Sequence, residues 1–299
     1  GQIADQYIND DSSLNRMTEE AFRRSQKDIR LSYIVVPVAK TAAPADTLKA
    51  WKKINEALNL LKQNKSFEET ALAYSEDPFV KTNQGDLGYV TVFDLPYAVE
   101  STAYQTPVGK ISPVFRTGGA YLIIKKTGER PAAGRIRIAQ ILLIFPFQAD
   151  DSAKVDTRRR ADSLYQAIRG GSDFGELARK FSGDNLSYQL GGVMPEFGIG
   201  KYDPEFEKQA YALRKDGDIS EPFASSFGYH ILKRIARIPV SASPDKSTMD
   251  ALKERVKSDS RIEVSRNEML QTILKKTGFV QAIPAGSHLF TAHDSLLQN

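Results

Sequence analysis

The sequence predicts an α+β protein that contains two tandem copies of one domain, each a small, mostly antiparallel sheet surrounded by helices. The first observation is an internal repeat. Six residue pairs share one separation of 107 positions: Phe67/Phe174, Glu69/Glu176, Ala71/Ala178, Ser75/Ser182, Asp77/Asp184 and Gly85/Gly192. The second observation is that each copy opens on an isoleucine- and valine-rich run typical of a buried strand. The period is too long for a solenoid, so each copy is expected to bury its own core.

Composition sets the limits of the fold and of the chemistry. The chain has 299 residues, of which 41% are hydrophobic and 26% charged. This length and hydrophobic content are enough for two or three domains, each with a hydrophobic core. It has no cysteine, which excludes disulfides, thiolate metal sites and a cysteine nucleophile. No apolar run is long enough to span a membrane. The chain begins at Gly1 without methionine, as a processed chain would, so a signal peptide is expected to lie outside this sequence.

The charge pattern gives no argument for nucleic acid. The formal net charge is only +4 and is dispersed along the chain. The densest basic run, 158–160, is surrounded by aspartates and predicts a solvated helix face. We therefore expect no nucleic-acid partner.

The elements of each copy follow in the same order. Residues 29–38 and 135–145 predict the opening strands, and 46–63 and 156–169 predict amphipathic helices. A short helix follows at Phe174 and at its counterpart Phe67, each preceded by a residue suited to an N-cap (Asp or Ser). A glycine-bearing loop, a helix over 204–213 and two short strands complete the second copy, with Gly217 and Gly228 as turn glycines.

The two ends of the chain differ from the repeats. We expect a helical segment over 1–28, repeat domains over 29–130 and 131–240 with 131–137 as their linker, and a helical segment over 241–299. Predicted helices within these ends are 18–28 with Thr18 as cap, 247–257 with a weak capping box, and 263–276. Their apolar faces could pack on each other, on a repeat, or on chain outside this sequence.

The motif DFGELARKFSGD…GGVM…PEFEKQAYAL…GDIS.PF…FGYHILK resembles the parvulin family of peptidyl-prolyl cis/trans isomerases, over most of both copies. Two such domains between helical ends resemble the SurA and PrsA group of extracytoplasmic chaperones. The resemblance implies binding of unfolded or extended polypeptides, outer-membrane proteins among them, with prolyl isomerisation as the associated activity. It also implies a periplasmic or otherwise extracytoplasmic location and no cofactor.

The resemblance assigns site residues in each copy. In the second copy, the proline-binding cup is Met194, Tyr202 and Phe206, and the polar network is Asp184, His230 and, where most of the family has histidine, Gln140. In the first copy the corresponding residues form a degenerate site: Leu87, Leu95, Val99, Asp77, Tyr33 and Tyr121. Tyr121 is matched there to His230, and its hydroxyl is expected to close a buried polar network. These matches place the isomerase activity more in the second domain than in the first.

Alternatives remain at several of these positions. His230 could be a core histidine, and Asp77 and Asp184 could simply begin loops. Ser225 beside His230 does not indicate a hydrolase, because the sequence has no nucleophile elbow. His288 and His293 have no acidic ligand set, so no metal site is expected. Two functions therefore remain: an isomerase acting on unfolded chains, or a non-catalytic chaperone that holds them in degenerate parvulin folds.

Overall fold

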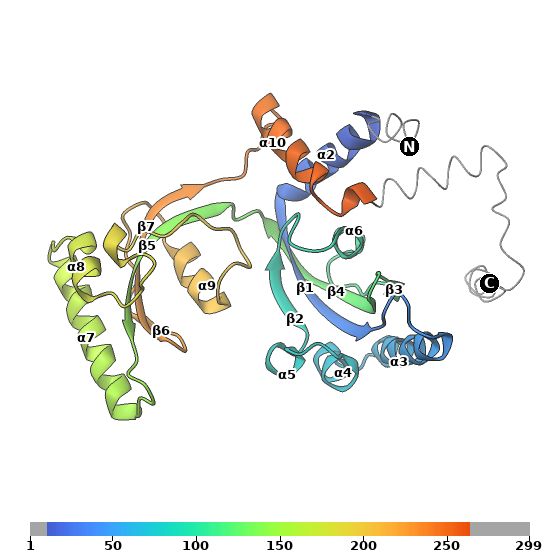
Figure 1. The fold of residues 1–299 in the computed structure, drawn as a ribbon, viewed down its shortest axis with the longest axis horizontal. Coiled ribbons are helices and arrows are strands. Elements are labelled where there is room, and N and C mark those ends of the chain that lie inside the picture. The colour runs from blue at the N-terminus through green and yellow to red at the C-terminus, as the bar shows by residue number, and fades with distance from the viewer. Residues whose placement is uncertain (1–10, 264–299) are drawn as a thin grey trace, which may run out of the picture.

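The computed structural model describes residues 11–263 (Figure 1). Within this range no helix is long and apolar enough to cross a membrane. The predicted helix 263–276 and the two tail histidines lie outside the described residues. The two repeats form separate sheets, each with its own helices.

The first repeat is built on a four-stranded antiparallel sheet in the order β2-β1-β4-β3. Its helices pack on opposite faces of the sheet, with α3 and α4 over one core cluster and α6 over the other. The bounds of its elements are β1 Lys27–Pro37, α3 Pro44–Lys62, α4 Phe67–Tyr74, α5 Val80–Asn83, β2 Asp86–Val90, α6 Tyr97–Gln105, β3 Phe115–Arg116 and β4 Ala120–Pro131.

The second repeat has a three-stranded sheet in the order β5-β7-β6, and α7 and α8 cover one face while α9 covers the other. Its loop after η1 makes only isolated bridges to β5, where the first repeat forms strand β2. The bounds are β5 Arg135–Ile144, α7 Asp151–Arg169, α8 Phe174–Phe181, η1 Tyr188–Leu190, α9 Pro204–Ala212, β6 Phe223–Ala224 and β7 Gly228–Ile238.

Local sequence signals explain several element boundaries. Ser66 caps α4 by accepting the amide of Glu69, and Asp173 caps α8 by accepting the amide of Glu176, as predicted. Gly228 is not a turn glycine. It opens β7, and a Cβ there would lie 2.0 Å from the carbonyl oxygen of Leu143, so only glycine lets the strands approach.

The linker between the repeats is shorter than expected. Strand β4 extends to Pro131 and β5 begins at Arg135, which leaves only residues 132–134 between them. Asp28 of the first repeat accepts the amide of Ala133 at 2.9 Å, and Arg237 of the second donates to the Ala133 carbonyl oxygen at 3.2 Å. The connection is therefore held by hydrogen bonds from both repeats.

The terminal segments form a helical pair on the first repeat. Helices α2 (Asp11–Ser25) and α10 (Lys246–Lys257) lie side by side and share a small core with Val92 of the first repeat (Figure 1). Two predicted caps are wrong. Thr18 lies inside α2, where its hydroxyl bonds back to the Leu14 carbonyl, and Asp245 rather than Ser247 caps α10.

A buried ion cluster fastens this helical pair to α6. The Glu100 carboxylate, 1% exposed, accepts Arg24 Nη1 at 2.7 Å, Arg261 Nη2 at 3.0 Å and the amide of Phe93 at 2.8 Å. Arg261 is fully buried and also donates to Asp259 at 2.8 Å. Residues from both ends of the chain therefore meet on one carboxylate of the first repeat.

Candidate functional site

Strands β5 and β7 place Gln140 and His230 on the same face of the second sheet. Leu142 pairs with His230 and Gln140 with Leu232, so the two polar side chains are diagonal neighbours. The loop after α8 brings Asp184 next to them. Further along, the chain packs closely on β5 at Gly192, whose φ is +82° and where a Cβ would lie 2.3 Å from the Gln140 carbonyl oxygen.

The polar side chains form one continuous hydrogen-bonded chain. Gln140 Nε2 donates to Asp184 Oδ2 at 2.8 Å, and Gln140 Oε1 lies 3.1 Å from His230 Nδ1. His230 Nε2 lies 2.8 Å from the Ser225 hydroxyl. A carboxylate only accepts, so the glutamine amide must face it, and Nδ1 of His230 must then carry the proton. The Nε2 lone pair is left to accept from Ser225.

Burial keeps His230 uncharged. The ring is 5% exposed, and desolvation lowers its pKa from 6.5 to about 4, against the opposing attraction of the Asp184 and Asp203 carboxylates. The network therefore works with a neutral imidazole of one fixed tautomer.

The depressed pKa of His230 predicts a pH-dependent stability. Between about pH 6.5 and pH 4 the unfolded chain binds a proton that the folded chain refuses, so the free energy of unfolding falls as the pH drops through this window. The loss is on the order of 3 kcal/mol at the acid end. Urea unfolding across this pH window gives the free energy of unfolding of the parent and of His230→Gln. The difference between the two should shrink as the pH falls, and a difference that does not change with pH would contradict the prediction.

An aromatic cluster adjoins the polar network. The rings of Tyr202 and Phe206 are 5.3 Å apart, and Phe206 meets His230 edge-on at 5.4 Å. Met194 is buried in the same cluster as Phe206. The structure therefore brings together the three residues assigned to the proline-binding cup and sets one of them, Phe206, against His230.

Sequence reasoning missed four members of this site. Ser225 holds Nε2 of His230, and Ser187 donates a short hydrogen bond to Asp184. Phe223 stacks on the His230 ring at 5.3 Å, and Phe197 packs edge-on against Tyr202 at 4.7 Å. Phe223 had a usable signal, because it ends the repeated GKISPVF/GDISEPF motif and matches Phe115.

The aspartates fill both of the roles that the sequence left open. Asp184 Oδ1 accepts a hydrogen bond from the amide of Leu186, and this bond starts the loop after α8. Asp184 Oδ2 accepts a hydrogen bond from Gln140 and so belongs to the polar network. Asp77 does the same in the first repeat, accepting the amide of Phe79 through Oδ1 and the hydroxyl of Tyr33 through Oδ2.

The prediction that Tyr121 matches His230 is wrong by one position. Tyr33 pairs with Ile124 as Gln140 pairs with Leu232, so the position diagonal to Tyr33 is Leu122, not Tyr121. The same register matches Tyr121 with Tyr229. The first repeat therefore has leucine where the second has histidine.

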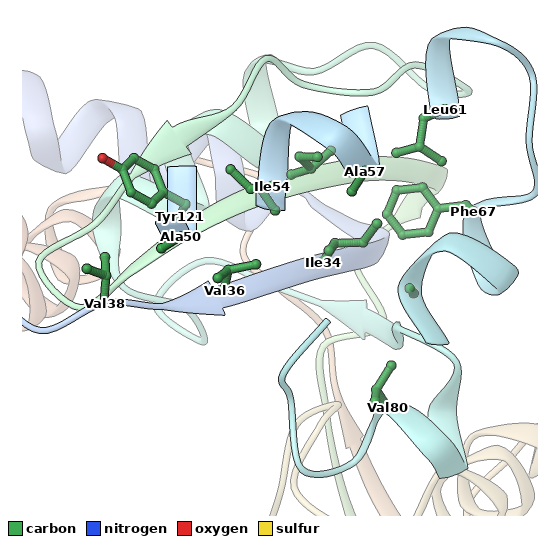
Figure 2. Packing of buried hydrophobic residues seen from close by; sticks show 12 residues of the cluster. Ile34, Val36, Val38, Ala50, Ile54, Ala57, Leu61, Phe67, Val80 and Tyr121 are labelled. Carbon is green, nitrogen blue, oxygen red and sulfur yellow. The ribbon is translucent and has the colours of Figure 1, made fainter. Parts of the chain in front are cut away.

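Tyr121 accordingly does not close a polar network. Its ring packs in the core beneath α3 with Val36 and Ile54 (Figure 2). Its buried hydroxyl has no hydrogen-bond partner among the described residues. A one-residue change of register moves a side chain to the other face of a sheet, which explains the error.

The apolar side of the first site is also incomplete. Val99 and Leu95 pack with Leu122 and Phe115 in one cluster, as expected for a degenerate cup. Leu87 does not join them: it lies on β2, where its side chain is 36% exposed. What remains is an aliphatic cluster beside the Tyr33–Asp77 hydrogen bond. Burial, followed by that hydrogen bond, raises the pKa of Tyr33.

Removing the hydroxyl group of Tyr33 or of Tyr121 should have different effects on stability. Tyr33→Phe should lower the free energy of unfolding by about 1–2 kcal/mol, because a hydrogen bond to a half-buried carboxylate is lost. Tyr121→Phe is the matched control and should cost nothing, because its hydroxyl is buried without a partner. Urea unfolding of both variants measures this, and equal losses would mean that the Tyr121 hydroxyl is paired after all.

Comparison with known proteins assigns both repeats to one family. Residues 34–128 and 141–236 each match the family described as "Rotamase: PPIC-type PPIASE domain". The chain is 28% identical over 258 residues to Chaperone SurA of Pseudomonas aeruginosa, covering 84% of this chain and 58% of that protein. It is 28% identical over 249 residues to Chaperone SurA of Nitrosococcus oceani, covering 79% and 57%.

The chain therefore spans less than two thirds of the length of these relatives. Among solved structures, it is similar to a peptidylprolyl isomerase, PrsA, from Bacillus anthracis at 28% identity and a TM-score of 0.32, covering 50% of this chain and 62% of that one. The two matched segments cover more than half of the chain, and each spans the helices and part of the sheet of one repeat. The chain belongs to the parvulin, or PPIC-type, family of peptidyl-prolyl isomerases.

Proposed function

We propose that this protein is a peptidyl-prolyl cis/trans isomerase of the parvulin type that acts on unfolded or extended polypeptides as a folding factor, with its activity in the second domain. The observation that carries the proposal is the apolar cluster of Met194, Tyr202 and Phe206, whose Phe206 ring lies against the neutral His230. This combination offers a proline ring an apolar seat and presents polar groups of fixed orientation beside it.

The chemistry requires no nucleophile and no metal. Rotation about the X–Pro bond meets a barrier of about 18–20 kcal/mol, because amide resonance is lost in the twisted state. Water stabilises the planar, more polar amide, so an apolar seat that removes water favours the twisted one. The network adds dipoles but no cation, since His230 is neutral, and donation runs in one fixed direction, from the Ser225 hydroxyl through His230 and Gln140 to the Asp184 carboxylate.

The first domain serves in this proposal as a binding module. Leu122 stands at the histidine position and Tyr33 at the position of Gln140, so the polar chain through an imidazole cannot form there. The partly buried Leu95 and Phe115, which pack against Val99 and Leu122, are the apolar groups that a client chain would contact there.

A non-catalytic holding chaperone is the second candidate. Gln140 favours it, because the second domain keeps one imidazole where most of the family has two. The similarity to chaperones at 28% identity supports binding of unfolded polypeptides in either case. The proposal includes outer-membrane proteins among the clients. It also includes a periplasmic or otherwise extracytoplasmic location, and the absence of cysteine suits such an oxidising compartment.

Exchange spectroscopy with the intact chain tests the proposal. The protein should accelerate cis/trans exchange of an Ala-Pro peptide at substoichiometric concentration. No acceleration, together with retained suppression of aggregation of an unfolded polypeptide, would replace isomerisation by the holding function. An unfolded outer-membrane β-barrel protein compared with an unfolded water-soluble protein would test client choice in the same aggregation assay.

A further inference from the structure

Helix α3 of the first repeat exposes two large apolar side chains. Leu48 is 51% exposed, and Trp51, the only tryptophan in the sequence, is 41% exposed. The opposite side of the helix packs on the sheet through Ala50, Ile54 and Leu61 (Figure 2). The first repeat therefore builds its core without Leu48 and Trp51, and their exposure needs another explanation.

Helical spacing places both residues on one solvent-facing stripe of α3. We call it the outer stripe, and its members follow one another at intervals of three or four residues: Leu48, Trp51, Lys52, Asn55, Asn59 and Lys62. All six side chains are exposed or partly exposed. The outer stripe thus combines a leucine and a tryptophan with two lysines, and none of its members is a carboxylate.

Neighbouring residues do not neutralise the charge of the outer stripe. Lys52 and Lys62 form no ion pair within residues 11–263, not even with Glu56, which lies one turn after Lys52. The two carboxylates of α3 itself, Asp46 and Glu56, fall on a different stripe, which they share with Lys53. The outer stripe therefore presents a net positive charge beside two apolar groups.

The second repeat shows that the fold does not require these side chains. Helices α3 and α7 match at the same separation of 107 positions, which puts Val155 at the position of Leu48 and Arg158 at that of Trp51. Arg158 pairs with Asp162 at 3.7 Å along α7. The matching stripe of α7 is therefore basic, but it has no tryptophan and it contains a carboxylate.

The shape and size of the outer stripe favour a membrane over a protein partner. The stripe is the convex face of one helix, whereas a specific protein interface occupies about 20–30 residues on each side. A lipid bilayer needs no complementary shape. Tryptophan and leucine enter its interfacial region, while lysines stay among the headgroups and attract anionic lipids.

The position of α3 gives a flat surface access to the outer stripe. Figure 1 shows α3 at the edge of the first repeat that lies farthest from the second repeat, on the opposite side from α2 and α10. We propose that the outer stripe of α3 is a membrane-contact surface that binds bilayers carrying anionic lipid headgroups. The proposal is independent of the isomerase activity, because it involves no residue of either prolyl site.

Trp51 reports directly on this contact, because the chain has no second tryptophan. The intact protein is titrated with vesicles made of equal parts of phosphatidylglycerol and phosphatidylcholine. The Trp51 emission should shift to shorter wavelength as the ring leaves water, and the protein should sediment with the vesicles. Vesicles of phosphatidylcholine alone should bind about 25-fold more weakly, since each lysine contributes about fivefold, and added salt should weaken binding to the anionic vesicles.

A matched pair of double variants tests which helix makes the contact. Lys52→Gln with Lys62→Gln should weaken binding to the phosphatidylglycerol vesicles by about 25-fold and leaves the tryptophan in place as the reporter. Arg159→Gln with Arg169→Gln, at the matching positions of α7, is the control and should bind as the parent does. The four side chains are exposed, so urea unfolding of both variants should match the parent, and the single lysine variants serve if it does not.

Three results with vesicles would overturn the proposal. They are an absent emission shift with phosphatidylglycerol vesicles, sedimentation with these vesicles without an emission shift, and equal weakening by the lysine and the arginine variants. An emission shift that grows with protein concentration without vesicles would also overturn it, because a second copy would then cover the outer stripe. A shift caused by an unfolded polypeptide but not by vesicles would assign the stripe to client binding instead.

Discussion

Replacing His230 with alanine should lower kcat/KM for prolyl exchange by about 10²-fold. The variant removes the group between Gln140 Oε1 and the Ser225 hydroxyl, so both lose their partner and the dipoles beside the twisted amide are no longer fixed. Exchange spectroscopy on the intact chain measures the effect. The first domain has leucine, Leu122, at the matching position, so it has no imidazole with which to replace the one that is removed.

Tyr229→Phe is the control for this experiment. Tyr229 precedes His230 on β7 but packs on the opposite face, which α7 and α8 cover, so exchange should be unchanged. Phe206→Ala is the second variant, because it deletes the centre of the aromatic cluster while leaving the polar chain in place. Phe206 is buried, so folding of this variant must be verified first. A His230→Ala protein with parental activity would remove the second domain from the mechanism.

Replacing Glu100 with alanine should lower the free energy of unfolding by about 3–5 kcal/mol. The change leaves the guanidinium groups of Arg24 and Arg261 buried without their carboxylate, and removing one partner of a buried ion pair costs far more than the pair contributes. Urea unfolding gives the magnitude. Hydrogen exchange should show the loss concentrated in α2 and α10, because the cluster holds them on α6.

Glu76→Ala provides the comparison. Glu76 pairs with Lys53 at 2.8 Å on the surface, where an ion pair contributes about 1 kcal/mol or less. Equal losses in Glu76→Ala and Glu100→Ala would show that the buried cluster does not hold the terminal helices.

Much of the fold could be predicted because its signals are local. The two opening strands, the helices after them and the N-caps Ser66 and Asp173 depend on periodicity and on hydrogen bonds within a few residues. The proximity of Met194, Tyr202 and Phe206 could be predicted because the motif fixes their order along the chain, and the structure places these residues in one cluster.

The parts that were missed depend on contacts between distant segments. Aligning the closing strands of the two repeats by their aromatic rings matched Tyr121 to His230. The pairing of β4 with β1 shows that Leu122 occupies the equivalent position instead. Thr18 has the chemistry of a cap, yet packing of α2 against α10 extends the helix beyond it. Local propensity cannot report either outcome.

The sequence alone determined that one domain was duplicated and that the second copy keeps a histidine, an aspartate and an aromatic cup, because residue identity and spacing are carried by the chain itself. Tertiary structure alone decided which side chains share a face, that Ser225 holds His230, and that Glu100 meets Arg261 across 161 positions. The physical reason is that side chains alternate between the faces of a strand, so one residue of register, set by a partner far along the chain, decides whether a group lies in the site or in the core.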